Sequence, residues 1–371
     1  MSVVVLIPTY QRPETLKWSL KSVLLQDTTK IIDEKLKIVI LNNDTGTKVV
    51  ETAVQETIDD IGKRRFNEIS IIHRDPPILG IYNFYNGIFE NTSEGDIAIL
   101  HGDDDIMLQG SLTKRYFIAK ESNAAFNICN TSAKVYFFRN DINVYLQKKE
   151  RKVNSKEMAN WSQASKEDLL KYSLPFVSAY CYKIGPEFWY CYEEAKKWAE
   201  DLPLEPKIRL PFLPFYMGIS AWLNKQLVVI QEDLVLRGQL LESRFFLPPR
   251  FVTEYANTGI IMQTGLAVLN NSKLGVLKEL DELRIDMRKA TAPYLFFSFF
   301  KRDGVTLTQL RELYSLTKTN WMSKEYILKT IIENFKSISR NILFLNNLRN
   351  RLSGWGQKTE PQKFWSEWAS F

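Results

Sequence analysis

The sequence predicts an α/β fold in which helices cover both faces of a mostly parallel sheet. Within the first 100 residues, short apolar segments rich in Val and Ile alternate four times with segments of helical spacing. A chain that alternates strand and helix in this way builds parallel strands joined by crossover helices. The composition agrees, because 371 residues with 45% hydrophobic and 25% charged residues are enough for a large core.

The first predicted strand covers residues 3–7, a β-branched run closed by Pro8, and such a run is typical of a strand buried on both faces. Pro13 stands where the first turn of a helix accepts proline, and apolar residues follow it at helical spacing. The next predicted elements are a strand over 36–41, a helix over 47–58, a strand over 69–73, a helix over 80–90 and a strand over 96–100.

Beyond residue 110 the pattern is less regular. The further predicted elements are strands over 124–130, 134–138, 175–184 and 226–230, and a helix over 215–225. From about residue 243 the apolar spacing is helical. We therefore expect one domain over 1–240, in halves 1–115 and 116–240, followed by a mostly helical region over 241–371.

Charge and cysteine content narrow the class of protein. The 49 basic and 43 acidic residues leave a net charge of +6, and residues 336–371, with six basic and two acidic residues, hold most of it. Three cysteines without a CxxC pair argue against a disulfide framework and a structural zinc site, and favour a reducing compartment. The sequence has no basic leader and no run of about 18 apolar residues, so we expect a cytoplasmic protein.

Three polar loops follow predicted strands, with the sequences PTYQR (8–12), NNDTG (42–46) and HGDDD (101–105). In parallel sheets, ligands bind beyond the carboxyl ends of the strands, where these loops would meet. The three adjacent carboxylates of the last loop repel one another unless a positive charge lies among them. A divalent cation or a cationic ligand is the expected partner, and a polar turn in water is the alternative.

These motifs together resemble the GT-A glycosyltransferases of family 2. The resemblance covers residues 1–115, and the triple Asp after a glycine is most similar to the abequosyltransferase-like branch, which makes bacterial surface polysaccharides. It implies a GT-A, Rossmann-like fold in which 1–115 binds a nucleotide sugar and 116–240 binds the acceptor. The matching residues outside the acidic run are Pro8, Thr9, Tyr10, Arg12, Asn43, Asp44, Gly80 and Asn83.

The implied activity is the metal-dependent, hexosyltransferase-type transfer of a sugar from a nucleotide diphosphate sugar to a saccharide acceptor. The resemblance implies a lipid-linked acceptor in O-antigen or capsule assembly at the inner face of the membrane. Mn²⁺ or Mg²⁺ would neutralise the departing diphosphate, and carboxylate oxygens are suitable ligands for both ions.

The acidic run matches the family's D-x-D-D motif, with Gly102 at the first Asp position. This match makes Asp104 the metal ligand, Asp103 a contact to the ribose or, through water, to the metal, and Asp105 a supporting member of the metal site. Because the first Asp is missing, the division of roles among the three stays open. A solvated turn with helix-capping Asp residues is the alternative.

The resemblance also implies the nucleotide contacts. Asn43 or Asp44 would bind the edge of a pyrimidine base, although the segment is also a plausible plain turn. Tyr10 would stack on the nucleotide, and Arg12 would approach the phosphates or an Asp. The remaining residues expected at the nucleotide are Pro8, Thr9, Gly80, Asn83, Asp103 and Arg74, the last as a second cation near the crevice.

The catalytic base is the least defined residue. Inverting members of the family carry a carboxylate before a helix of the acceptor half, but the corresponding stretch here, RLPFLP, has none. Asp201, in the segment AED, is the candidate base; a solvated helix end is its alternative, and a retaining mechanism would need no such base. His101, beside the acidic run, either pairs with a carboxylate or is structural.

Near residue 371, the aromatic residues Phe364, Trp365, Trp368 and Phe371 share one helical stripe. With the basic residues before it, this stripe would either lie on an anionic membrane surface or pack back on the domain.

Two other classes of protein are alternatives. A sugar nucleotidyltransferase would carry a glycine-rich phosphate loop after the first strand, and PTYQRPET has no glycine. A nucleic-acid-binding protein would need basic and aromatic residues along one face, whereas an acidic crevice repels a polyanion. We therefore expect no nucleic acid partner.

Overall fold

The computed structural model describes residues 1–45, 47–130, 134–138, 141–146, 160–165, 168, 177–200, 213–241, 364, 365 and 368. The chain divides into two compact units, and the first consists of Met1–Ala195, Leu213–Ser243 and Thr359–Phe371. The predicted helical region over 241–371 lies outside the described residues apart from Leu241 and three aromatic residues, so it stays a prediction.

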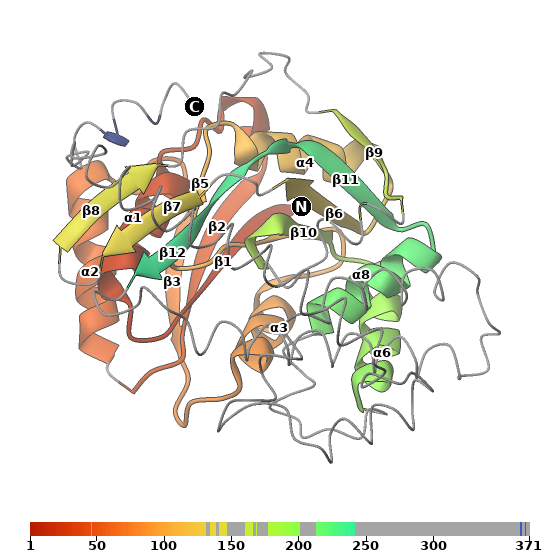
Figure 1. The fold of residues 1–371 in the computed structure, drawn as a ribbon, viewed down its shortest axis with the longest axis horizontal. Helices are drawn as coiled ribbons and strands as arrows, with labels where there is room; N and C mark the ends of the chain where they lie inside the picture. Colours follow the sequence, from red (N-terminus) through yellow and green to blue (C-terminus); the bar gives the residue numbers. More distant parts are fainter. Residues whose placement is uncertain are drawn as a thin grey trace, which may run out of the picture. The chain divides into compact units, whose positions relative to one another are not determined.

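An eight-stranded sheet forms the centre of the first unit (Figure 1). Its strand order is β3-β2-β1-β4-β10-β6-β11-β9. The neighbours from β3 to β4 are parallel, β10 is antiparallel to both of its neighbours, and β6 and β11 are parallel again. The predicted mostly parallel sheet is therefore confirmed. The strands are β1 (Ser2–Thr9), β2 (Lys35–Asn42), β3 (Glu68–His73), β4 (Ile97–Leu100), β6 (Phe126–Asn130), β9 (Trp161–Gln163), β10 (Tyr180–Lys183) and β11 (Leu227–Asp233).

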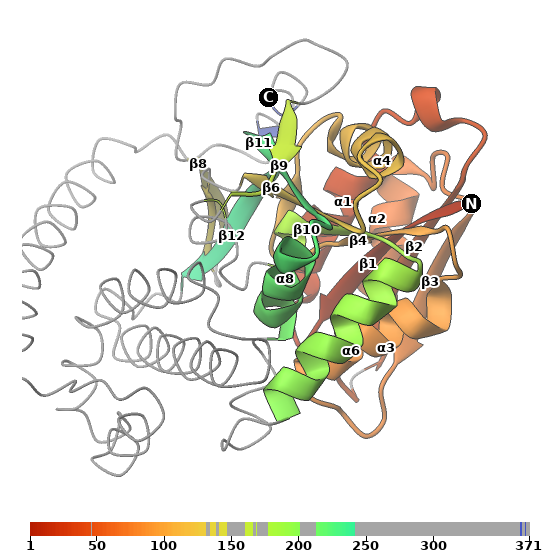
Figure 2. The same cartoon turned by 90° about the vertical axis from the view of Figure 1, so that its right-hand side faces the viewer.

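Helices cover both faces of this sheet, as Figure 2 shows. The side chains of Val3, Val5 and Ile7 on β1 join an apolar cluster with α1 (Pro13–Leu24), α2 (Thr47–Ile61) and α4 (Ser111–Glu121). The opposite face lies against α3 (Gly80–Asn91), α6 (Pro186–Glu200) and α8 (Leu213–Leu223). Burial on both faces explains why the strands are continuous apolar runs. Two short 3₁₀ turns, η1 (Thr29–Ile31) and η2 (Val177–Ala179), complete the described helical elements.

A second sheet of four strands has the order β5-β12-β7-β8. Its strands are β5 (Ile106–Met107), β7 (Lys134–Phe138), β8 (Asp141–Leu146) and β12 (Val235–Leu241). β12 follows β11 after a single residue, Leu234, and pairs with β5 directly beyond the acidic run. The sequence did not predict β5, β8 or β12.

Other elements also differ from the sequence-based expectation, which did not include β9 or α6. The strand predicted over 175–184 is confirmed only at Tyr180–Lys183; Val177–Ala179 form the turn η2. Ser178 turns its hydroxyl towards the acidic run instead of continuing the strand. α4 was not predicted because its inward face carries polar groups, including the fully buried Arg115, which interrupt the apolar spacing.

Aromatic residues near position 371 pack on α1 and β5. Phe364 and Trp368 are buried against Trp18, and Trp365 stacks on the same indole with ring centroids 5.2 Å apart. The indole N–H of Trp368 donates a hydrogen bond of 3.2 Å to the carbonyl of Met107. Phe364 and Trp368 therefore pack on the domain, which was one of the two alternatives for the stripe, while Phe371 lies outside the described residues. No helix in the described ranges has the length and apolar character needed to cross a bilayer.

We expect Phe364→Ala to lower the free energy of unfolding by about 3–5 kcal/mol, because a fully buried aromatic ring would leave a cavity. Urea denaturation followed by circular dichroism measures the change. Tyr190→Ala, at an exposed site, serves as the control and should change stability by less than about 0.5 kcal/mol. Equal effects of the two substitutions would show that Phe364 is not part of the core.

Candidate functional site

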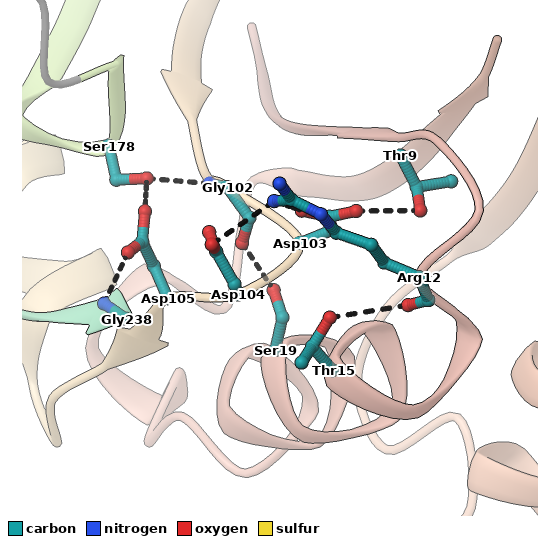
Figure 3. Close-up of polar contacts among 10 residues, drawn as sticks. All are labelled: Thr9, Arg12, Thr15, Ser19, Gly102, Asp103, Asp104, Asp105, Ser178 and Gly238. Carbon is teal, nitrogen blue, oxygen red and sulfur yellow. Dashed lines mark hydrogen bonds and ion pairs between the residues drawn. The ribbon is translucent and has the colours of Figure 1, made fainter. Parts of the chain in front are cut away.

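Thr9 connects the three polar loops at the carboxyl ends of β1, β2 and β4 (Figure 3 shows its hydroxyl contact). The backbone N–H of Asn43 donates to the Thr9 carbonyl at 3.0 Å. The Thr9 hydroxyl donates to Oδ2 of Asp103 at 2.8 Å. The loops therefore meet at one edge of the sheet, as the topology of parallel strands predicts.

The guanidinium of Arg12 lies between two carboxylates of the acidic run. Its Nη1 is 3.4 Å from Oδ1 of Asp103 and 3.1 Å from Oδ2 of Asp104. The sequence left open whether Arg12 approaches the phosphates or an Asp, and in this structure it contacts two Asp residues (Figure 3). The positive charge that the acidic run requires is supplied here by the protein itself.

The carboxyl group of Asp103 is nearly buried and has a strongly shifted pKa. The pKa of Asp103 is raised to about 7, mainly by burial and to a lesser extent by repulsion from the Asp104 carboxylate. Arg12, the Thr9 hydroxyl and a backbone hydrogen bond from Tyr10 act in the opposite direction, because each stabilises the charged form. A cation beside Asp103 therefore favours its ionised state.

Both carboxylate oxygens of Asp105 accept hydrogen bonds from neighbouring parts of the protein. Its Oδ2 accepts a hydrogen bond from the hydroxyl of Ser178 in η2, and its Oδ1 accepts one of 2.7 Å from the backbone N–H of Gly238 in β12. The side chain is also buried. Protein donors bind both oxygens of Asp105, so its carboxylate can support the loop that carries Asp103 and Asp104, and its expected supporting role at a metal site stays a prediction.

Two glycines allow the backbone to pack closely around the acidic run. A Cβ atom on Gly238 would lie 1.6 Å from the carbonyl oxygen of Asp104, and one on Gly102 would lie 2.5 Å from Oδ2 of Asp105.

Two serines, Ser19 and Ser178, form hydrogen bonds to the backbone of the same loop. The Ser19 hydroxyl donates to the Gly102 carbonyl at 2.8 Å, and the Gly102 N–H donates to the Ser178 hydroxyl at 2.6 Å.

Sequence analysis missed Ser19, Ser178 and Gly238. Ser178 and Gly238 are 73 and 133 positions from Asp105, the residue that they bind, and no local pattern marks them. Ser19 lies inside a helix with ordinary apolar spacing, so its role appears only when α1 is placed against the loop.

His101 is fully buried and does not pair with an Asp side chain in the described part of the chain. The pKa of His101 is lowered to about 3, mainly by burial and to a lesser extent by repulsion from the positive charge of Arg115. The structural alternative is therefore the one that the geometry supports. Arg115 itself donates to the Ser178 carbonyl at 2.8 Å and to the sulfur of Cys129 at 2.9 Å, which fixes η2 behind the acidic run.

The structure distinguishes the two candidates for binding the base. The side-chain amide of Asn43 is occupied on both sides, since its Oδ1 accepts from the Ile78 N–H at 2.9 Å and its Nδ2 donates to the Ile78 carbonyl at 2.7 Å. Asp44 is half-buried, and among the described residues no hydrogen bond to its carboxylate is found. Asp44 is therefore the better placed of the two.

Arg74 and Asn83 brace the ends of β2 and β3. Arg74 binds Glu90 through two nitrogens at 3.0 and 2.7 Å and donates from Nε to Asn83 at 3.0 Å. Asn83 in turn donates to the Leu41 carbonyl at 2.9 Å. The charge of Arg74 is thus compensated by Glu90 in this structure.

The remaining residues predicted to contact the nucleotide or to act as the base differ in how exposed they are. Pro8 is half-buried in β1, Tyr10 is 53% exposed beyond it, and Gly80 opens α3 with nothing within 4 Å of where a Cβ would stand. Tyr10 is therefore accessible for stacking, and Gly80 is not required by lack of space. Asp201 lies outside the described residues.

The residues present can provide part of a metal site. Within the described ranges there is no group of three or more His, Cys, Asp or Glu side chains suited to a metal ion. Asp103 Oδ1 and Asp104 Oδ2 nevertheless point at one position, which Arg12 Nη1 now occupies. Mg²⁺ commonly uses one or two carboxylates together with substrate phosphates, so this pair suits such an ion if phosphate oxygens complete the shell.

The structure is similar to that of S. aureus TarS. Residues 1–349 of TarS match with a TM-score of 0.50 at 12% identity, over 85% of this chain and 79% of that chain. The same segment of TarS in complex with UDP-GlcNAc matches with a TM-score of 0.49 at 13% identity, over 85% and 82%. Searches of the sequence against protein-family models and curated proteins find no match. At such identity the likeness concerns the fold alone, and that fold is of the GT-A glycosyltransferase type.

We expect Asp105→Ala to lower the free energy of unfolding by about 2 kcal/mol or more, since two donors would lose their acceptor. Asp105→Asn should lose less, because the amide keeps the shape and one oxygen. Asp104→Ala is the control, with a side chain 23% exposed, and should cost less than about 1 kcal/mol. Chemical denaturation compares the three, and equal losses for Asp105→Ala and Asp104→Ala would contradict a scaffold role.

The buried His101 predicts a pH dependence of stability. Its folded pKa of about 3 lies below its unfolded value of 6.5, so the unfolded state binds more protons between these values. Its contribution is complete above pH 6.5 and declines as the pH falls towards 3. The stability of the wild type relative to His101→Leu should fall by about 2 kcal/mol between pH 7.5 and 5. A constant difference across this range, measured by urea denaturation, would show that His101 titrates equally in both states.

Proposed function

We propose that this protein is a glycosyltransferase that moves a sugar from a nucleotide diphosphate sugar to a saccharide acceptor. The observation that carries the proposal is the meeting of three polar loops at Thr9, on a fold of the GT-A glycosyltransferase type. The buried Asp103 carboxylate and the neighbouring Asp104 form the acidic centre of this edge. Ligands of such sheets bind at this edge.

In this proposal different side chains bind different parts of the nucleotide sugar donor. Asp44 binds the base edge, and the exposed Tyr10 ring stacks on the nucleoside. Asp103 and Asp104 hold Mn²⁺ or Mg²⁺, which when bound neutralises the charge that develops on the departing diphosphate. Thr9 fixes the orientation of Asp103 by its hydrogen bond of 2.8 Å.

We further propose that the acceptor is a lipid-linked saccharide in bacterial surface polysaccharide assembly and that the reaction is of the hexosyltransferase type. The support is the similarity of the Gly102–Asp105 run to the abequosyltransferase-like branch. Asp201 is the candidate base for an inverting reaction, and a retaining reaction would not need it.

A thermal-shift panel of UDP, GDP, TDP and their nucleotide sugars, with and without Mn²⁺, tests the proposal. A ligand at 100 times its dissociation constant stabilises the native state by about 2.7 kcal/mol, so one of these nucleotides should raise Tm in the presence of Mn²⁺. Asp104→Asn should abolish the shift because it removes one of the two negative charges that would hold the metal.

Asp59→Asn, at an exposed position on α2, is the matched control and should shift like the wild type. A panel in which no nucleotide changes Tm would count against a glycosyltransferase. A shift that is independent of Mn²⁺ and survives in Asp104→Asn would reject the metal site alone.

A further inference from the structure

The guanidinium of Arg12 occupies the position at which the proposed metal would bind. One nitrogen, Nη1, contacts both Oδ1 of Asp103 and Oδ2 of Asp104. A divalent ion cannot share these oxygens with a guanidinium at the same point, because the two cations would repel each other. Arg12 must therefore leave before a metal can use both carboxylates.

We propose that Arg12 is a tethered counter-ion that exchanges places with the metal. In the donor-free protein it pairs with Asp103 and Asp104. When metal and nucleotide diphosphate bind together, Arg12 releases both carboxylates and binds the diphosphate oxygens. This inference rests on the proposed function and adds an ordered coupling between the two ligands.

The geometry allows Arg12 to move. The residue precedes α1 as its N-cap, its side chain is 45% exposed, and its guanidinium has only the two Asp partners within the described part of the chain. No other hydrogen bond of the described structure is broken when the side chain swings away. A planar guanidinium is also well suited to binding two phosphate oxygens at once.

Asp103 keeps its position during such an exchange. Its two oxygens have different partners, since Oδ1 faces Arg12 and Oδ2 accepts the Thr9 hydroxyl at 2.8 Å. Departure of Arg12 removes the cation from Oδ1, while the Thr9 hydroxyl and the Tyr10 backbone N–H still hold the carboxylate at the end of β1. The metal therefore encounters a carboxylate that is already oriented.

The exchange makes the binding of metal and nucleotide interdependent. Metal alone would have to displace Arg12 into water, whereas metal with a diphosphate offers the guanidinium a new anionic partner. Metal should consequently bind weakly by itself and tightly with the nucleotide, and linkage makes the effect reciprocal.

Arg12→Gln tests this coupling because it should change the two affinities in opposite directions. Mn²⁺ binding is measured by electron paramagnetic resonance of the free ion, without nucleotide. The affinity for UDP, GDP or TDP, whichever shifts Tm, is measured by calorimetry at saturating Mn²⁺. We expect Mn²⁺ alone to bind about tenfold more tightly to the variant, and the nucleotide with Mn²⁺ about tenfold more weakly.

Two further variants provide controls. Lys17→Gln removes one positive charge from the first turns of α1, close in sequence to Arg12, at a site paired with Glu14 and Glu56, and should leave both affinities unchanged. Arg12→Lys keeps the charge without the planar fork and should lie between the wild type and Arg12→Gln. Circular dichroism of each variant confirms that it is folded.

An Arg12→Gln protein that binds Mn²⁺ alone no more tightly than the wild type overturns the exchange. If the wild type still binds nucleotide with Mn²⁺, the proposed function is unaffected by that result. If the wild type instead binds nucleotide equally well without Mn²⁺ and Arg12→Gln loses this binding, Arg12 is itself the permanent cation, and the exchange is also rejected. Absence of any nucleotide binding by the wild type would reject the proposed function.

Discussion

The arrangement of this site depends on the burial of one carboxylate, that of Asp103, at the end of β4. An ionised group removed from water is costly unless charged and hydrogen-bonding partners replace its hydration. Thr9, Tyr10 and Arg12 are the partners; Thr9 ends β1, and the other two lie in the loop that follows it. The adjacency of β1 and β4 in the sheet is therefore a requirement of the charge as well as of the apolar core.

Neighbouring residues of the acidic run serve different purposes because the backbone turns between them. Asp103 and Asp104 face Arg12, while Asp105 is directed to η2 and β12. Asp103 and Asp104, the carboxylates that can bind a cation, thus lie on a loop that is held to the second sheet by the hydrogen bond between Asp105 and Gly238. Glycines at 102 and 238 permit this close packing, since neither position has space for a Cβ atom.

Much of the N-terminal architecture was predictable because it rests on local signals. Apolar runs, Pro13 and the polar loops at strand ends predicted every strand and α-helix from β1 to β4, although not the short turn η1, and the edge at which the loops meet. α4 escaped prediction because Arg115 lies on its inward face, and β12 because its partners are distant in sequence. Asn43 is a poorer candidate than Asp44 for binding the base because its side-chain amide is bonded to the backbone of Ile78. Asp105 is bonded to Ser178 and Gly238, which are distant in sequence. Neither set of hydrogen bonds could be inferred from the local sequence pattern.

The hydrogen bond from Trp368 to Met107 joins residues 261 positions apart. A ribosome adding about 5–20 residues per second would need on the order of ten seconds or more to cover that interval. Throughout this time the indole of Trp18 lacks the aromatic partners that bury it in the finished protein. Burial of Trp18 is therefore completed only after residues 364–368 have been synthesised, so this part of the core cannot form during most of translation.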